Sequence, residues 1–168
     1  MKPVAVFRFS QTEHPGRFGS WLTRHGIPWE LIPIDEGVAV PASPDAYSGI
    51  GMMGGPMSVN DRLPWIAPLE SLIRDAITDG TPVIGHCLGG QLMAKALGAK
   101  VSRMPAPEIG WFHVDVADRD ARREWFKRVV RHCGAEDANQ RNEQQQDDQE
   151  GKVKARGAFV SFGCHADI

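Results

Sequence analysis

Short apolar runs alternate with stretches of helical period along the first 98 residues of the chain. A run of about four to eight apolar residues that ends in glycine, proline or polar residues is typical of a buried strand. Apolar residues spaced as they are from Leu69 to Ile77 are typical of a helix packed on a sheet. Because parallel strands need crossover connections, the alternation predicts an α/β fold with a doubly wound, mostly parallel sheet covered on both faces.

The spacing of the apolar residues predicts where the individual helices and strands lie, and glycines mark the ends of the helices. We expect helices over 18–25, 69–77 and 88–97, each followed closely by a glycine. The expected strands cover 4–7, 29–34, 47–53, 82–85, 100–103, 111–116 and 158–162.

The character of the sequence changes near residue 118. Arg, Gln, Asp, Glu and Asn dominate residues 119–156, and no helical or strand period continues through them. Such a composition buries too little apolar surface to offset the entropy of ordering the chain. We therefore expect one incomplete α/β domain over 1–117 and a polar, poorly ordered tail over 118–168, with 158–162 as its one candidate strand.

Charge and composition exclude several classes of protein. The 168 residues contain 19 Lys and Arg against 21 Asp and Glu, a net charge of -2, so nucleic acid is not an expected partner. No apolar stretch approaches the roughly 20 residues of a membrane span, and residues 1–10 lack the apolar region of a signal peptide. The three irregularly spaced cysteines favour neither disulfides nor a metal site. We expect a cytoplasmic protein without metal or cofactor.

The residues with the clearest chemical meaning lie in 82–91, Pro-Val-Ile-Gly-His-Cys-Leu-Gly-Gly-Gln. A strand that runs through Gly-x-Cys-x-Gly into a helix is the cysteine form of the nucleophile elbow, whose tight turn needs small residues at Gly85 and Gly89. Cys87 would then stand above the carboxyl ends of the strands, where open α/β sheets bind ligands. A lone cysteine is more often a small buried residue. The strand, elbow and helix together favour a nucleophile, with the Leu88 N–H facing a developing oxyanion.

A second glycine-rich segment follows the strand expected over 47–53. Gly54 and Gly55 allow the backbone to approach a substrate closely, and the Gly55 N–H would complete an oxyanion hole with that of Leu88. Taken alone, Gly-Gly-Pro is only a turn signal. Its place at a strand end makes it a candidate part of the same site.

Three segments together carry a family resemblance. Gly-Gly-Pro-Met-Ser at 54–58, Gly-His-Cys-Leu-Gly-Gly-Gln at 85–91 and Glu-Ile-Gly-Trp at 108–111 resemble, in order and spacing, the signatures of the class I glutamine amidotransferases. The stand-alone relatives of the GMP synthetase amidotransferase domain are the most similar members.

The resemblance implies a flavodoxin-like domain in which cysteine attacks the side-chain amide of glutamine or of another γ-glutamyl small molecule. Ammonia leaves, and water hydrolyses the resulting thioester. By the same resemblance Cys87 is the nucleophile, Gly55 and Leu88 donate to the oxyanion, and Gln91 helps to hold glutamine beside Gly54. Family members pass ammonia to a synthetase domain or subunit, so a synthetase is the expected partner.

The sequence departs from the family pattern in its last part. Members carry His-Pro-Glu on a late strand, and this sequence contains no His-Pro-Glu, so we expect the sheet to lack the family's last strands. A general acid and a general base are still required for turnover. His165 and Asp167 keep the His-x-carboxylate spacing and are the nearest substitutes. A shifted reading frame near 119–123 or a genuine natural tail would each explain the change, and translating the other frames of the coding DNA distinguishes them.

Three functions from different classes follow from these residues. The first is a glutamine-hydrolysing enzyme, the second a catalytically lapsed relative that binds a γ-glutamyl compound, and the third a redox-sensing thiol protein. Gln91 and the Gly54–Gly55 segment favour the first two, because redox sensing has no use for them.

Overall fold

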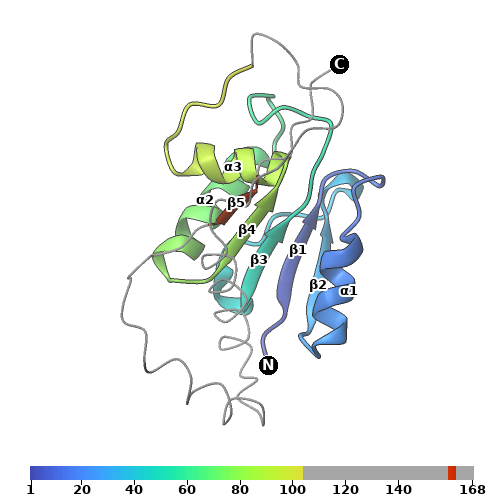
Figure 1. Cartoon of the computed structure of the whole chain (residues 1–168). Coiled ribbons are helices and arrows are strands. Elements are labelled where there is room, and N and C mark those ends of the chain that lie inside the picture. Colours follow the sequence, from blue (N-terminus) through green and yellow to red (C-terminus); the bar gives the residue numbers. More distant parts are fainter. Residues whose placement is uncertain (104–158, 162–168) are drawn as a thin grey trace, which may run out of the picture.

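The computed structural model describes residues 1–103 and the short strand 159–161. Its sheet contains five strands, and each hydrogen-bonded pair is parallel. The order β2-β1-β3-β4-β5 is that of flavodoxin-like domains, so the predicted doubly wound α/β fold is confirmed (Figure 1). The strands are β1 (Val4–Arg8), β2 (Trp29–Pro33), β3 (Gly49–Met52), β4 (Val83–His86) and β5 (Phe159–Ser161).

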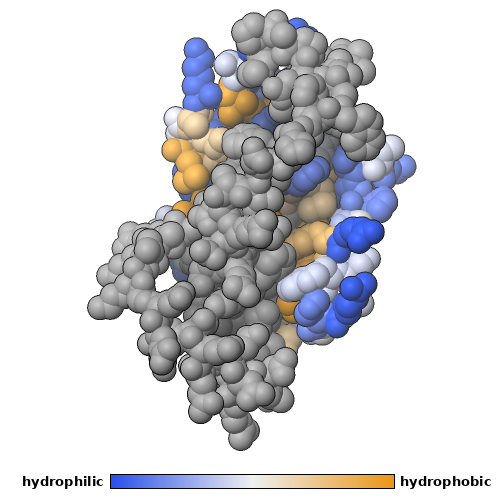
Figure 2. Space-filling model, viewed as in Figure 1, coloured by the Kyte–Doolittle hydropathy of each residue, from blue (hydrophilic) through white to orange (hydrophobic). Residues whose placement is uncertain are grey.

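Helices cover both faces of this sheet. Helix α1 (Gly16–Arg24) lies on one face, and α2 (Ile66–Thr78) and α3 (Leu88–Ala96) lie on the other (Figure 1). Alternate residues of β1 therefore join different cores: Val6 packs with Leu22 of α1, and Phe7 belongs to the cluster that includes α2 and α3. Burial on both faces explains why β1 is continuously apolar. The outward side of α1 is hydrophilic (Figure 2).

The three predicted helices are confirmed, with small differences at their ends, of which the largest is at the start of α2. This helix begins at Ile66 rather than at 69, because Pro68 lies in its first turn, where proline's missing N–H would have no intrahelical partner. The helices are followed by Gly26, Gly80 and Gly98, which have positive φ angles of 66°, 78° and 90°. These are the left-handed stops that the sequence predicted. Two 3-10 helices, η1 (Ile34–Glu36) and η2 (Pro44–Ala46), were not predicted.

The expected strand over 100–103 is wrong, because these residues form neither helix nor strand. The Asn60 side chain donates a 3.0 Å hydrogen bond to the Val101 carbonyl. The segment 100–103 is therefore held by the loop that follows β3 and not by a neighbouring strand. Strand β3 starts at Gly49, two residues later than expected, and the strand expected over 111–116 lies outside the described residues. The strand expected over 158–162 is confirmed as β5, which pairs with β4. No helix in the described part is long and apolar enough to cross a membrane.

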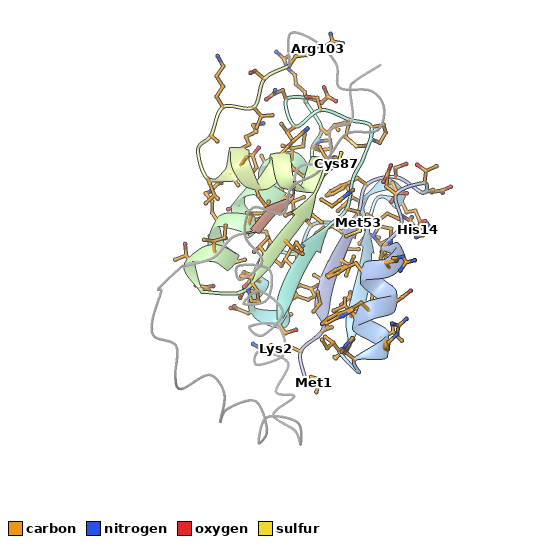
Figure 3. All side chains as sticks on the ribbon, viewed as in Figure 1. Met1, Lys2, His14, Met53, Cys87 and Arg103 are labelled. Atoms are coloured by element: carbon orange, nitrogen blue, oxygen red, sulfur yellow. The ribbon has the colours of Figure 1, made fainter. Side chains whose placement is uncertain are left out.

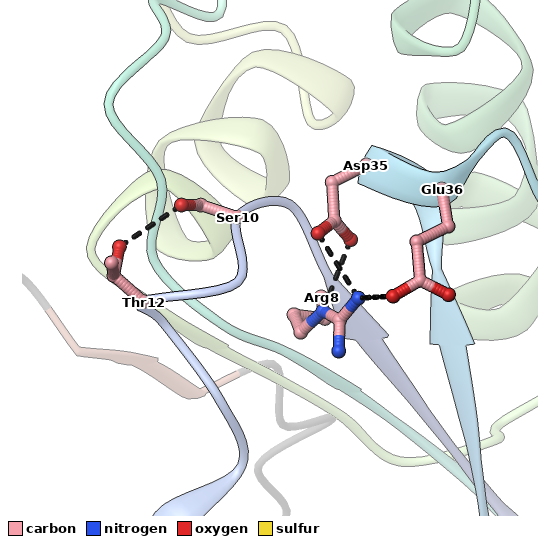
Figure 4. A network of polar contacts seen from close by, with 5 residues as sticks. All are labelled: Arg8, Ser10, Thr12, Asp35 and Glu36. Carbon is pink, nitrogen blue, oxygen red and sulfur yellow. Dashed lines mark hydrogen bonds and ion pairs between the residues drawn. The ribbon is translucent and has the colours of Figure 1, made fainter.

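A polar cluster fixes the carboxyl end of β1. Arg8 donates two 3.0 Å hydrogen bonds to the Asp35 carboxylate and a third to Glu36, both in η1 (Figure 4). The side chains of Arg8 and Asp35 are each 13% exposed. The hydrogen bonds to Asp35 and then Glu36 raise the pKa of Arg8 above its ordinary value. This contact holds β1 where the chain leaves the sheet toward residues 10–15.

Candidate active site

Cys87 connects β4 to α3 in a strained backbone conformation. Its φ of 52° and ψ of -113° lie in a region that favours glycine, and it is the non-glycine residue with positive φ in the described part of the chain. Such strain costs on the order of 1–3 kcal/mol and persists only where the surrounding structure imposes it. Cys87 lies at the carboxyl end of the sheet (Figure 3) and is 7% exposed. A strained residue at a strand-to-helix turn is the geometry of a nucleophile elbow.

Two glycines make this turn sterically possible. A Cβ on Gly85 would lie 2.4 Å from the carbonyl carbon of Gly89, and a Cβ on Gly89 would lie 2.6 Å from the Cβ of Met52. Both positions therefore require glycine. The N–H of Gly89 donates a 3.2 Å hydrogen bond to the Met53 carbonyl, which fixes the first turn of α3 against the end of β3.

The structure brings Gly54 and Gly55 to this elbow. A Cβ on Gly54 would lie 3.5 Å from the Cβ of Cys87, and one on Gly55 would lie 2.8 Å from Cδ2 of Leu88. The segments at 54–58 and 85–91, separated in sequence, thus meet at the carboxyl ends of β3 and β4. A side chain on Gly55 would also collide with the Met57 sulfur at 2.7 Å.

Two backbone donors beside Cys87 lack an acceptor within the described residues. Leu88 is the first residue of α3, where a helix leaves its N–H groups without intrahelical partners. No hydrogen bond between described residues uses the N–H of Leu88 or that of Gly55, whereas Gly89 is bonded to Met53. Unpaired N–H groups beside a helix N-terminus suit an oxygen that acquires negative charge.

Gln91 lies one helical turn beyond the elbow. Its N–H donates a 3.1 Å hydrogen bond to the Cys87 carbonyl, and its side chain is half-buried. Residues four apart share a helix face, so the backbone of Gln91 lies on the face of α3 that starts at Cys87.

No histidine of the described part forms a hydrogen bond with Cys87. His86 is exposed, the His14 ring accepts from the Gly16 N–H at 3.0 Å, and the His25 ring lies 2.8 Å from the Trp21 carbonyl oxygen. His165 and Asp167 lie outside the described residues. Among residues 1–103, no cluster of three or more His, Cys, Asp or Glu side chains could hold a metal ion.

Sequence analysis missed the contacts that hold the loop after β3. The Lys95 ammonium donates a 2.5 Å hydrogen bond to the Val59 carbonyl and lies 3.1 Å from Oε1 of Glu70. Lys95 therefore fastens this loop to α3, and the Asn60 bond described above fastens it to the segment that follows α3. No residue pattern indicates these contacts, because two of the three acceptors are backbone carbonyls.

Sequence analysis also missed Glu13. Its Oε2 atom would lie 3.1 Å from a Cβ on Gly54, so the carboxylate lies beside the Gly54–Gly55 segment. Glu13 comes from the connection between β1 and α1. The sequence indicates that β1, β3 and β4 end at the same edge of the sheet, but it does not indicate that Glu13 lies beside Gly54 there.

An open hollow of about 760 Å³ lies beside α1, lined in part by His14, Arg17 and Trp29. Cys87 is not among its lining residues. We therefore locate the candidate site from the elbow geometry.

Residues 21–144 match the model of the family "Glutamine amidotransferase class-I". The chain belongs to this family. It is 30% identical over 115 residues to the glutamine amidotransferase-like protein YfeJ of Salmonella typhimurium, a match that covers 66% of this chain and 48% of that protein. It is also 34% identical over 93 residues to the glutamine-hydrolysing GMP synthase of Aeropyrum pernix, covering 55% of this chain and 17% of the synthase.

A solved relative has the same fold. The crystal structure of a glutamine amidotransferase from Methylobacillus flagellatus matches with a TM-score of 0.64 and 51% sequence identity, covering 66% of this chain and 45% of that one. The chain therefore spans about half the length of YfeJ and of the Methylobacillus protein.

Proposed function

We propose that Cys87 hydrolyses the side-chain amide of glutamine, or of a related γ-glutamyl compound, to a γ-carboxylate and ammonia. The observation that carries the proposal is the strained elbow, which holds a cysteine next to the N–H groups of Leu88 and Gly55 and close to Gly54. Membership of the class I glutamine amidotransferase family supports glutamine as the substrate.

In the proposed reaction the Cys87 thiolate attacks the γ-carbonyl carbon, a C–S bond forms, and the carbonyl oxygen becomes an oxyanion. The Leu88 and Gly55 N–H groups donate to that oxyanion, which lowers the barrier because these donors are already in place. Collapse breaks the C–N bond, and protonation lets ammonia leave. Water then cleaves the thioester and regenerates the thiol. Gln91 holds the amino-acid end of the substrate.

The proton transfers need a group other than the described histidines. His165, oriented by Asp167, is the proposed acid and base, because a protonated imidazole can release ammonia and a neutral one can activate water. The acceptor of ammonia would be a separate synthetase, as the similarity to glutamine-hydrolysing GMP synthase supports. We propose a cytoplasmic location for this reaction.

The test is covalent trapping with the diazoketone analogue of L-glutamine, diazo-oxo-L-norleucine. We expect its methylene carbon to alkylate Cys87 with loss of dinitrogen, as peptide mass spectrometry would detect. The double variant Cys133→Ser/Cys164→Ser, which retains Cys87, should label like the wild type, and Cys87→Ser should not label.

Ammonia release from L-glutamine then separates the candidate functions. Labelling together with ammonia release identifies the hydrolase. Labelling without ammonia release identifies a γ-glutamyl-binding relative, whose cysteine still reacts with the probe. A Cys87 that resists the diazoketone but is rapidly oxidised by peroxide would overturn the proposal in favour of a redox thiol.

A further inference from the structure

Glu13 places a carboxylate next to the proposed nucleophile. The point that a Cβ on Gly54 would occupy lies 3.1 Å from Oε2 of Glu13 and 3.5 Å from the Cβ of Cys87. The carboxylate and the cysteine therefore both lie beside the same glycine. They reach it from different strands, since Glu13 follows β1 and Cys87 follows β4.

The backbone around Glu13 is fixed, whereas its carboxylate has no partner among the described residues. The Glu13 N–H donates a 3.0 Å hydrogen bond to the Ser10 carbonyl, and the hydroxyls of Ser10 and Thr12 lie 3.0 Å apart (Figure 4). No hydrogen bond or ion pair of the described part involves the half-buried Glu13 side chain. Arg8, the last residue of β1, is already bound by Asp35 and Glu36.

A half-buried carboxylate is stabilised by a cation, and since no cation of the described residues binds this one, the substrate can supply it. When the γ-carbonyl of a γ-glutamyl compound lies at Cys87, its α-carbon is three C–C bonds away, at most about 4 Å, and the nitrogen on that carbon is four bonds away, about 5 Å in an extended chain. The Cβ of Cys87 and Oε2 of Glu13 are separated by no more than the sum of their two distances from the Cβ position of Gly54, so this nitrogen can reach the carboxylate. The nitrogen on this α-carbon is that of an ammonium group.

We propose that Glu13 is a specificity residue that binds the substrate's α-ammonium group and so selects γ-glutamyl amides with an unblocked α-amino group. The inference rests on the proposed function, because it places the substrate's γ-carbonyl at Cys87. Substrates without that amine, or with the amine acylated, lose a charge-assisted hydrogen bond and leave the carboxylate unpaired.

The experiment compares two probes that differ only in the amine: diazo-oxo-L-norleucine and its counterpart without the α-amino group. The second-order rate of Cys87 labelling is measured for the wild type, Glu13→Gln and the control Glu30→Gln, which removes the same charge from an exposed position on β2. We expect Glu13→Gln to slow labelling by the amino-bearing probe about tenfold to a hundredfold. The rate with the other probe should stay unchanged, and Glu30→Gln should match the wild type with both.

Each other result is decisive. If Glu13→Gln changes neither rate, or slows both probes equally, the role of Glu13 is overturned while labelling of Cys87 leaves the proposed function standing. If neither probe labels Cys87 in the wild type, the proposed function fails and the inference fails with it.

A measurement on the wild type alone removes any dependence on how Glu13→Gln folds. The preference for the amino-bearing probe should decrease as salt is raised, because screening weakens an ion pair at a half-exposed carboxylate. The rate with the amine-free probe should show no matching decrease. A preference that is absent, or independent of salt, would contradict an ion pair with Glu13.

Discussion

Gly85 and Gly89 face each other across the elbow with no space for a side chain, since a Cβ on Gly85 would lie 2.4 Å from the carbonyl oxygen of Gly89. The obstacle is backbone, so a different rotamer cannot relieve the collision. The position of Cys87 between them therefore depends on two missing side chains as well as on the hydrogen bonds of the elbow.

Gly85→Ala should lower both stability and reactivity. Forcing a methyl group into packed backbone costs about 1–3 kcal/mol of unfolding free energy or more, and the relaxation displaces the start of α3. Urea denaturation should show a lower midpoint, and the diazoketone should label Cys87 more slowly. Gly37→Ala is the control, because Gly37 has a φ of 83° but no atom within 4 Å of the added Cβ. It should lose about 1–2 kcal/mol to backbone strain alone and label at the wild-type rate.

Most of the sheet could be predicted because each strand has a recognisable apolar pattern in its own residues. The run from Val4 to Phe7 is apolar since β1 is buried on both faces, and Gly26 and Gly80 end helices through their positive φ. The elbow was equally predictable, since the residues that form it lie within one short segment of the sequence. Gly85, Cys87 and Gly89 have no alternative arrangement in a strand-to-helix turn.

The remainder depends on contacts between residues far apart in sequence. The segment 100–103 has strand-like residues, but the Asn60 side chain binds its backbone. Glu13 lies beside Gly54 only because β1 and β3 are neighbours in the sheet, a relationship that no local pattern contains. Lys95 binds the backbone carbonyl of Val59. Because every residue has a backbone carbonyl, the sequence does not indicate which one Lys95 binds.

The Arg8–Asp35 contact should stabilise the carboxyl end of β1. Asp35 accepts two of the Arg8 hydrogen bonds, whereas the half-exposed Glu36 accepts one. Asp35→Asn should therefore lower the urea midpoint more than Glu36→Gln, because a bidentate pair is lost. Equal midpoints in these two variants would show that the bidentate geometry contributes nothing to stability.

Tyr47 should make the fold sensitive to high pH. Burial, and then the negative charge of Glu30, raise the pKa of Tyr47 above its ordinary value of 10.0. Below pH 10 the phenol is neutral in both states; above it the unfolded chain releases the proton first, so unfolding free energy falls as pH rises. Tyr47→Phe should lose less stability than the wild type as the pH rises above about 10. Parallel urea titrations of the two proteins check this, and identical pH profiles would contradict it.

Cys87 should be less favourable for folding than glycine at the same position. With φ of 52° and ψ of -113°, any residue with a Cβ is strained by on the order of 1–3 kcal/mol, and glycine is not. Cys87→Ala keeps the strain and Cys87→Gly removes it. The greater entropy of the unfolded chain with glycine lowers the stability of Cys87→Gly by roughly 0.5–1 kcal/mol, which offsets part of this gain. Cys87→Gly should therefore be more stable than Cys87→Ala by about 1 kcal/mol in urea denaturation. Neither variant should react with the diazoketone. If glycine is the less stable of the two, the elbow is not strained in solution, and the conformation attributed to a nucleophile loses its physical basis.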